Sequence, residues 1–194
     1  MFNKKVKNVK IDLRIIKTKE ALHEALLTIL KEKPLESISI SEICRKAKVN
    51  RGTFYLHYNQ IGDLFEEYFK EIMADLANSY HEPYRHVEKL KTEELDPSTI
   101  RIFHHIEKYK AFYRIVFSKK VPLVYYYLLF NEVKKLLINE VIHQNEIEPG
   151  FYSSYQANAI LGMIIQWYMD DFQQSANFLN EQLVKILNTK DKGK

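Results

Sequence analysis

The sequence contains few of the residues that mark disulfide-linked, loop-rich or membrane-spanning proteins. It has one cysteine, five glycines and five prolines among 194 residues. A single cysteine excludes an internal disulfide framework and fits a reducing cytoplasm. No segment approaches about 18 uncharged apolar residues, so we expect no transmembrane helix. No apolar stretch follows the first lysines either, and a secretory signal is therefore not expected.

The local motifs of common enzymes are also missing. The sequence has no G-x-S-x-G elbow, no phosphate-binding loop, and no group of His, Cys and carboxylate residues at metal-ligand spacing. His104 and His105 are neighbours, and on a helix their side chains would point about 100° apart and could not chelate one ion together. We therefore expect neither an enzyme, nor a metal site, nor a cofactor.

What the chain does contain is apolar residues at helical spacing. It is 46% hydrophobic and carries 24 Phe and Tyr residues, enough to fill a sizeable core. Apolar residues recur at i, i+3, i+4 and i+7 in several segments, whereas no strand-like alternation is long enough to build a sheet. These patterns predict an all-α fold.

Positive charge is concentrated in the first third. Residues 1–58 hold 13 Lys and Arg against 6 Asp and Glu, a net charge of +7, and the remainder carries −3. Such a basic segment suggests contact with a polyanion, although a solvated basic surface is the alternative. Residues 1–11 are Lys-rich without an apolar period, and we expect a flexible arm that adds non-specific affinity for DNA or is merely a solvated tail.

The sequence predicts a long helix followed by short ones. A helix over residues 12–33 should end before Pro34, which lacks an N–H. Ser39 and Glu42 form an S-x-x-E capping box that predicts a second helix from residue 40 to about 47. Asn50 is the cap expected for a third helix, and Asn59 for a fourth. Two short helices joined by a tight turn indicate a helix-turn-helix domain, which binds DNA.

Later segments suggest a helical C-terminal part. Apolar periodicity predicts helices over residues 97–117, 120–144, 151–173 and 175–188, with Pro122 in the first turn of the second and Pro149–Gly150 separating the second from the third. The expected organisation is an arm and helix-turn-helix domain (1–58), a linking helix (59–80) and a C-terminal domain (81–194).

About 30 residues, ISISEICRKAKVNRGTFYLHYNQIGDLFEEY, resemble the N-terminal domain of the TetR family of bacterial transcriptional regulators. The pattern consists of Ala47-x-Val49, then Thr53-Phe54-Tyr55-x-His57-Tyr58, then Asp63-Leu64-Phe65. Several residue types must coincide at fixed spacing, so the match is specific. The resemblance implies a three-helix helix-turn-helix domain followed by a helical bundle for dimerisation and effector binding.

The residues of the third predicted helix suit DNA chemically. Phe54 should face inward, while Arg51 can reach guanine O6 and N7, and Thr53 a thymine methyl or a phosphate. There are two alternatives: Arg51 contacts only a phosphate, and Tyr55 and Tyr58 are packing residues. The resemblance adds phosphate contacts on the first two helices. The residues expected to bind DNA are Thr18, Ser41, Lys46, Lys48, Asn50, Arg51, Thr53, Tyr55, His57 and Tyr58.

Three positions depart from the family pattern. Lys48 occupies the turn position where Gly is usual, so we expect a strained left-handed residue that adds a phosphate contact. Ile61 replaces a Lys that clamps the DNA backbone in many members, and this makes Asn59 and Gln60 substitute candidates. Cys44 stands where Ala is common and is interpreted as a small buried residue.

The resemblance implies a homodimer and an effector site. The C-terminal segments resemble a Gram-positive branch of the family, some of whose members act on dihydroxyacetone kinase genes. The expected function is a repressor released by a small molecule; the alternative is a DNA-binding regulator whose C-terminal domain binds a protein. Effector-pocket candidates, for which core packing is the alternative, are Phe103, Phe112, Tyr113, Tyr126, Phe130 and Trp167. Dimer-interface candidates are Tyr155, Ile160, Ile164, Tyr168 and Leu183.

Overall fold

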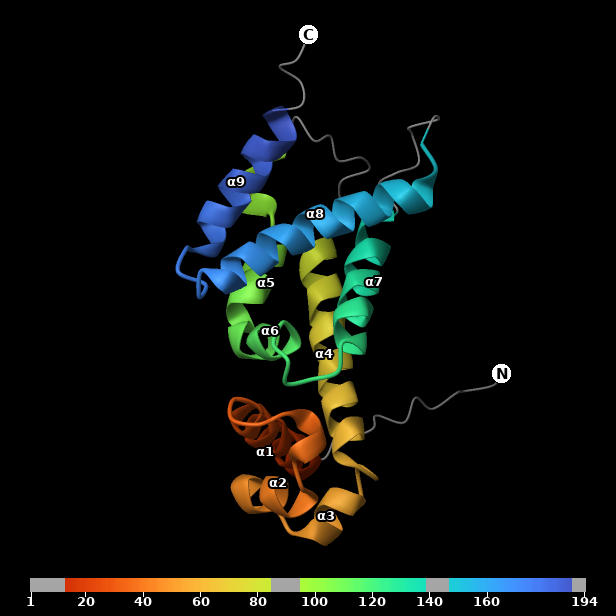
Figure 1. Ribbon diagram of the computed structural model, residues 1–194, viewed down its shortest axis with the longest axis vertical. Helices are drawn as coiled ribbons and strands as arrows, with labels where there is room; N and C mark the ends of the chain where they lie inside the picture. Colours follow the sequence, from red (N-terminus) through yellow and green to blue (C-terminus); the bar gives the residue numbers. More distant parts are fainter. Residues whose placement is uncertain (1–12, 85–94, 139–146, 190–194) are drawn as a thin grey trace, which may run out of the picture. The chain divides into compact units, whose positions relative to one another are not determined.

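The structure, a computed structural model, describes residues 13–84, 95–138 and 147–189 (Figure 1). Within these ranges every regular element is a helix and none is a strand, which confirms the all-α prediction. The elements are α1 (Leu13–Leu30), η1 (Leu35–Ser37), α2 (Ile40–Ala47), α3 (Arg51–Tyr55), α4 (Ile61–His81), η2 (Glu82–Tyr84), η4 (Pro97–Thr99), α5 (Ile102–Lys108), α6 (Lys110–Val116), α7 (Val124–Ile138), α8 (Pro149–Met169) and α9 (Ala176–Thr189). The expected arm, residues 1–11, lies outside the described residues.

The chain forms two compact units that meet inside α4, between Tyr68 and Phe69. This boundary falls within the segment 59–80 that the sequence predicts as a linking helix. The two units are described separately below as the first unit and the second unit. No helix in the described ranges has both the length and the apolar composition needed to cross a membrane.

The first unit consists of α1, α2, α3 and the first turns of α4. α1 packs against α2, and α2 against α3. α1 ends at Leu30, three residues before the predicted end, because Pro34 has an extended backbone and Glu32 and Lys33 both donate to the Ile29 carbonyl in a closing turn. Its core is made of side chains that are fully buried: Leu22, Leu26, Leu30, Ile43, Phe54, Leu64 and Phe65.

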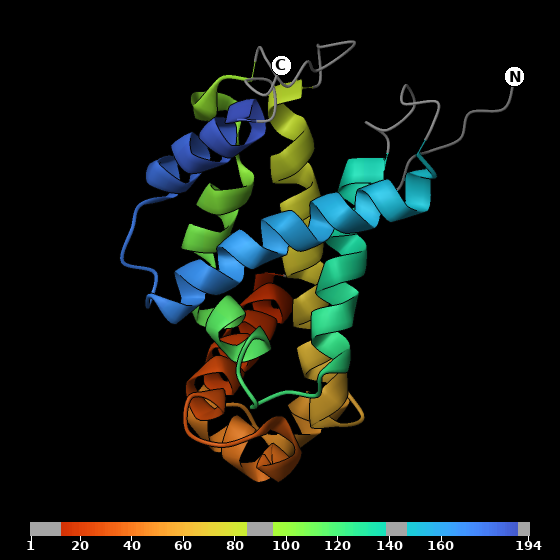
Figure 2. The same cartoon turned by 45° about the horizontal axis from the view of Figure 1, so that its top comes forward.

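The second unit contains the rest of α4 and all later elements. α8 crosses α7 and packs against it, and α9 packs against α5 and η4 (Figures 1 and 2). The predicted helix over 97–117 is wrong in one respect, because it is divided into η4, α5 and α6. The break lies at Tyr109, whose φ of −109° and ψ of 29° end α5 and begin α6. Apolar residues keep helical spacing on both sides of Tyr109, so periodicity alone did not reveal it.

The predictions for the two prolines of this region are also corrected. Pro122 precedes α7 rather than lying in its first turn, and its carbonyl accepts from the N–H of Tyr125. Pro149 begins α8 instead of separating two helices, because a proline at the first helical position loses no hydrogen bond there. The Glu148 carboxylate caps this end by accepting from the N–H of Phe151 at 2.9 Å.

The turn between α8 and α9 has a strained backbone, and Arg114 of α6 stabilises it. Asp171 and Phe172 have φ angles of 56° and 55°, in the left-handed region that costs non-glycine residues roughly 1 kcal/mol each. The Arg114 guanidinium donates to the Asp171 carboxylate and, at 3.1 Å, to its carbonyl, and it stacks over the Phe172 ring. These contacts fasten α6 to the end of α8.

Candidate nucleic-acid interface

Local side-chain caps fix where α2 and α3 begin. The Ser39 hydroxyl accepts from the Glu42 N–H, and the Glu42 carboxylate accepts from the Ser39 N–H at 3.0 Å, which confirms the predicted capping box. The pKa of Glu42 is lowered to about 2 because Lys33 and Ser39 donate hydrogen bonds to its carboxylate. At α3, the Asn50 side-chain oxygen accepts from the Thr53 N–H at 2.7 Å, and this confirms the second predicted cap.

The turn between α2 and α3 contains the expected left-handed lysine. Lys48 has φ 56° and ψ 38° and is the C-cap of α2. Its N–H and that of Val49 donate to carbonyls in the last turn of α2, so the chain reverses within three residues. The Lys48 side chain is exposed, and its ammonium is therefore available to a phosphate.

α3 has one inward and one outward face. Phe54 is completely buried and anchors the helix in the first unit. Arg51 and Tyr55 are exposed, and a hydrogen bond from Arg51 to the Tyr55 hydroxyl raises the pKa of the guanidinium. Thr53 and His57 are half-buried at the sides of the helix. The outward face is thus cationic and rich in hydrogen-bonding groups, as contact with base edges and phosphates requires.

Other predicted DNA-binding residues lie on the same unit with differing access. Ser41, Lys46 and Asn50 are exposed. Thr18 is half-buried, and its hydroxyl donates to the Arg14 carbonyl at 2.8 Å, one turn earlier in α1. The Thr53 hydroxyl likewise donates to the Asn50 side chain at 2.9 Å, so it has an acceptor lone pair rather than a free donor for DNA.

The expectation for Tyr58 is corrected. Its side chain is 4% exposed, and its hydroxyl donates to the Glu67 carboxylate. The phenol therefore belongs to the core of the first unit, which agrees with the packing alternative and removes it from the candidate phosphate contacts.

Sequence reasoning also missed one exposed residue. Leu56, directly after α3, is 80% exposed, and an apolar side chain at this place suits a thymine methyl or a sugar. In the sequence, Leu56 is an apolar residue that does not lie on the same helical face as the inward-facing Phe54. This departure from the apolar period was the signal that could have identified it. At the start of α4, the N–H groups of Asn59 and Gln60 both donate to the carboxylate of Asp63, which lies in the first turn of the helix.

In the second unit the effector-pocket candidates form part of an aromatic core. Phe103 meets Trp167 edge-to-face at a centroid distance of 6.3 Å, and Phe112 meets Tyr113 at 5.3 Å. These four side chains are at most 1% exposed, whereas Tyr126 and Phe130 are half-buried. The structure therefore buries four of the six candidates as two ring pairs, Phe103 with Trp167 and Phe112 with Tyr113.

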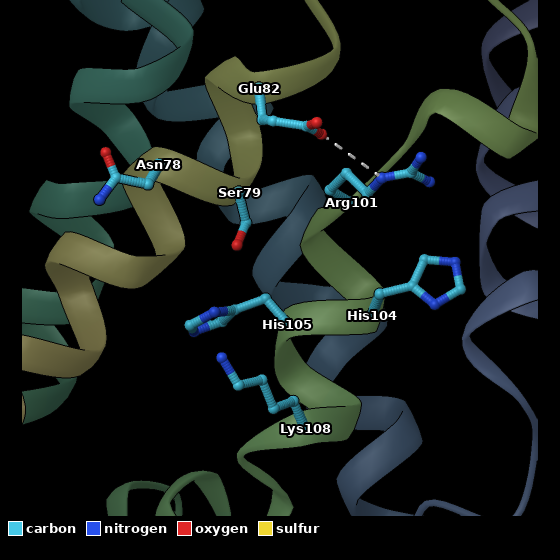
Figure 3. Close-up of a pocket in the computed structure, with 7 residues that line it drawn as sticks. All are labelled: Asn78, Ser79, Glu82, Arg101, His104, His105 and Lys108. Carbon is cyan, nitrogen blue, oxygen red and sulfur yellow. Dashed lines mark ion pairs between the residues drawn. The ribbon is translucent and has the colours of Figure 1, made fainter.

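A pocket of about 350 Å³ lies beside this core, between α4 and α5 (Figure 3). Ser79 points from α4 toward α5, while His105 and Lys108 extend to one side and Arg101 to the other. None of the six effector candidates lines it. The lining residues are all polar: Asn78, Ser79, Glu82, Arg101, His104, His105 and Lys108.

A hydrogen-bonded chain connects this pocket with the aromatic core. His105 Nδ1 lies 3.0 Å from the Asp75 carboxylate, which can only accept, so this nitrogen carries the proton. The Tyr113 hydroxyl then donates to His105 Nε2 at 3.1 Å. Burial lowers the pKa of His105 to about 4 even though Asp75 opposes the shift, and the imidazole is neutral at pH 7.

The dimer-interface candidates lie on α8, apart from Leu183 on α9, and they differ in exposure. Tyr155 is 58% exposed, and Ile160, Tyr168 and Leu183 are half-buried. Ile164 is completely buried inside the second unit, so its expected contact with a partner is corrected. It shares the inward face with Leu161 and Trp167. Across the described part of the chain, no three His, Cys, Asp or Glu side chains are grouped as a metal site.

Comparisons with known proteins agree with this geometry. Residues 22–68 match the family described as "Bacterial regulatory proteins, tetR family", and residues 93–189 the family "Transcriptional regulator C-terminal region". The chain is 22% identical over 170 residues to an uncharacterized HTH-type transcriptional regulator, YxbF of Bacillus subtilis, which covers 86% of this chain. That match spans 44% of YxbF, so this chain covers less than half the length of that relative.

Two further proteins are similar at comparable identity. DhaS of Lactococcus lactis, the activator of the dhaKLM operon, is 22% identical over 149 residues, covering 74% of this chain and 75% of DhaS. The solved structure of FadR from Bacillus subtilis in complex with stearoyl-CoA has a TM-score of 0.63 and 18% identity, covering 89% of this chain and 96% of FadR. The structural likeness shows a shared fold, and the match to DhaS confirms the resemblance to dihydroxyacetone kinase operon regulators.

Proposed function

Because the chain belongs to the TetR family of DNA-binding transcriptional regulators, we propose that it is a homodimeric cytoplasmic repressor whose α3 enters the major groove of a two-fold operator. The observation that carries this proposal is the outward face of α3. Arg51, Tyr55 and Leu56 are exposed there while Phe54 anchors the helix from behind. A guanidinium can grip guanine bidentately, and the apolar Leu56 fits a thymine methyl.

Basic groups around α3 supply the sequence-independent part of binding. Lys46 and Lys48 are exposed on α2 and in the turn, and both can meet phosphates that flank the groove. Each phosphate neutralised in this way releases a counterion, and the affinity for duplex DNA should therefore fall steeply with salt.

An exposed apolar stripe on α8 supports dimerisation. Phe151, Tyr155 and Met169 are 79%, 58% and 71% exposed, and with Gly162 they follow one face of the helix. A Cβ built on Gly162 would meet no atom within 4 Å, so a second helix has room to approach closely. A two-fold dimer would also double the few base contacts that one short α3 can make.

The second unit would carry the regulatory signal. A small molecule is favoured by the pocket between α4 and α5, because α4 also extends into the first unit. FadR, which shares the fold, was solved with stearoyl-CoA. A ligand that prefers one arrangement of the second unit would shift the population of DNA-binding states.

A protein partner is the second candidate, and tight packing of the aromatic residues favours it. Four of the six effector candidates have no more than 1% of their surface exposed. At the start of α7, by contrast, Leu123, Val124 and Tyr127 are 66%, 53% and 56% exposed, and these side chains suit a protein surface.

Selection of duplexes from a random-sequence pool tests the proposal. The purified protein should enrich an inverted repeat, and sedimentation should give twice the mass of one chain. Enrichment of no sequence, or an affinity that does not change with salt, would contradict it. A reporter gene behind the enriched site then decides the direction of regulation: repression is expected, and activation would place the protein with DhaS, which is named an activator.

A further inference from the structure

The carboxylate of Glu67 connects three helical segments of the first unit. Glu67 lies on α4, and its Oε1 accepts a hydrogen bond from the Lys19 ammonium of α1 at 2.6 Å. Its other oxygen accepts from the Tyr58 hydroxyl, in the turn that continues α3. The Lys19 ammonium also lies 5.9 Å from the centre of the Tyr58 ring. One acidic side chain thereby touches the segments on both sides of α2.

Tyr58 connects Glu67 to α3. Its N–H donates to the Phe54 carbonyl at 3.0 Å, so the turn that follows α3 is hydrogen-bonded back to the helix at Tyr58. Its ring lies 5.5 Å from that of Phe54, the residue that anchors α3. A five-residue helix has too few internal hydrogen bonds to hold its own orientation, and tertiary contacts must supply it.

The charge and hydrogen bonds of the Glu67 carboxylate favour one fixed side-chain position, unlike a mobile ion pair on the surface. Burial alone would raise the pKa of Glu67, but hydrogen bonds from Lys19 and Tyr58 outweigh it and lower the pKa. The carboxylate is therefore ionised and receives hydrogen bonds at both oxygens. Hydrogen bonds to a charged acceptor are shorter and stronger than those between neutral groups, and they constrain direction as well as distance.

We propose that Glu67 is a positioning residue for DNA recognition: through Tyr58 it fixes the rotation of α3, and with it the direction in which Arg51 and Tyr55 face the bases. The inference rests on the proposed DNA-binding function. It assigns a role in sequence discrimination to side chains that do not touch DNA. The non-specific affinity comes from surface lysines and does not depend on this rotation.

The test compares two affinities for each variant. The probes are the duplex enriched by the wild-type protein and a duplex of shuffled sequence. Tyr58→Phe removes only the hydroxyl and keeps the buried ring, and Glu67→Gln removes the charge. Each should lower the ratio of specific to non-specific affinity roughly tenfold, with the shuffled duplex bound within about twofold of wild type. Glu66→Gln, the same charge change at the exposed neighbouring position, should leave the ratio unchanged.

A double variant separates positioning from a general loss of stability. If Tyr58 and Glu67 act through one contact, Tyr58→Phe combined with Glu67→Gln should lower the ratio no further than the stronger single variant. Thermal unfolding is measured for every variant, and binding is measured well below each midpoint. A ratio that stays at the wild-type value in both single variants overturns the inference. So does a parallel loss of both affinities that follows the drop in midpoint.

The proposed function and this inference can fail separately. A wild-type protein that enriches no duplex removes the proposed function itself. A wild-type protein that discriminates strongly, with variants that discriminate equally well, removes only the role of Glu67.

Discussion

The two units of this protein differ in how much of their structure is set by contacts between residues close in the sequence. In the first unit the features that define the DNA-facing helices are local, such as the Ser39–Glu42 and Asn50–Thr53 caps, each three residues apart. In the second unit the defining contacts are distant in sequence. His105 meets Asp75 across 30 residues, and Asn180 donates to the Ile100 carbonyl across 80.

Under the proposed function, this difference separates the unit that recognises DNA from the unit that carries the regulatory signal. Local caps set where α2 and α3 begin, and the contact of Tyr58 with Glu67 adds the tertiary constraint on the direction in which Arg51 and Tyr55 face. A unit held by distant contacts can change shape when one contact is exchanged, as the chain from the pocket through His105 to Tyr113 allows. Ligand-dependent motion is therefore expected in the second unit.

Substitutions that create a similar cavity in each core should have the largest effect, and they test whether the two units unfold independently. Phe54→Ala in the first unit and Phe103→Ala in the second each remove a fully buried ring, at about 3–5 kcal/mol. Fluorescence of Trp167, the single tryptophan of the sequence, reports only the second unit, while circular dichroism reports both. We expect Phe54→Ala to move the dichroism transition and leave the fluorescence midpoint in place.

Phe103→Ala is the reciprocal control and should move the fluorescence midpoint. If both variants shift both signals equally, the chain unfolds as one unit and the comparison fails.

Acidification should weaken both units through one buried histidine in each. Burial lowers the pKa of His23 and of His105 to about 4, from an unfolded value of 6.5. The unfolded chain therefore binds more protons between these values, so stability is complete above pH 6.5 and declines toward pH 4. The loss approaches about 3 kcal/mol for each histidine.

Unfolding by urea across this pH range measures the effect. His105→Asn should flatten the pH dependence seen by Trp167 fluorescence, and His23→Asn should not. An unchanged slope in His105→Asn would show that other groups cause the acid sensitivity of the second unit.

Lys48→Gly should have the smallest effect on stability and binding. It should raise the unfolding free energy while weakening the contact with DNA phosphates. Glycine adopts the left-handed conformation without strain, so we expect a gain of about 1 kcal/mol in unfolding free energy. The lost ammonium should make the slope of log affinity against log salt shallower by about 0.9. Lys48→Arg keeps both strain and charge and serves as the control. An unchanged salt slope in Lys48→Gly would remove this residue from the phosphate contacts.

The range of contacts also explains what the sequence could predict. Both caps were predictable because each depends on two residue types three positions apart. The left-handed Lys48 was predictable only from the family pattern, in which Gly is usual at that position. Tyr58 was open between packing and phosphate contact, and its position four residues after Phe54 already favoured the buried face. Its hydrogen bond to Glu67 was not predictable, because it depends on the direction in which α4 leaves the short turn between Tyr58 and Ile61.

In the second unit the sequence indicated which segments are helical but not which side of each faces inward. The apolar residues of segment 151–173 cover a face wide enough for both a core and a partner helix, and periodicity did not decide that Ile164 belongs to the core. The same limit applies to the aromatic residues. Helical spacing predicts that Phe103 and Trp167 are buried, whereas the choice between lining a cavity and filling a core depends on contacts between distant helices.

The central claim is that α3 reads the major groove through Arg51, and methylation interference tests it most directly. Dimethyl sulfate methylates guanine N7, the atom that a bidentate guanidinium contacts. On the enriched duplex, methylation of one guanine in each half-site should block binding of the wild-type protein, and Arg51→Ala should lose that interference along with about 1–3 kcal/mol of affinity. Interference at the same guanine that persists in Arg51→Ala would contradict the assignment of Arg51 as the base-reading residue.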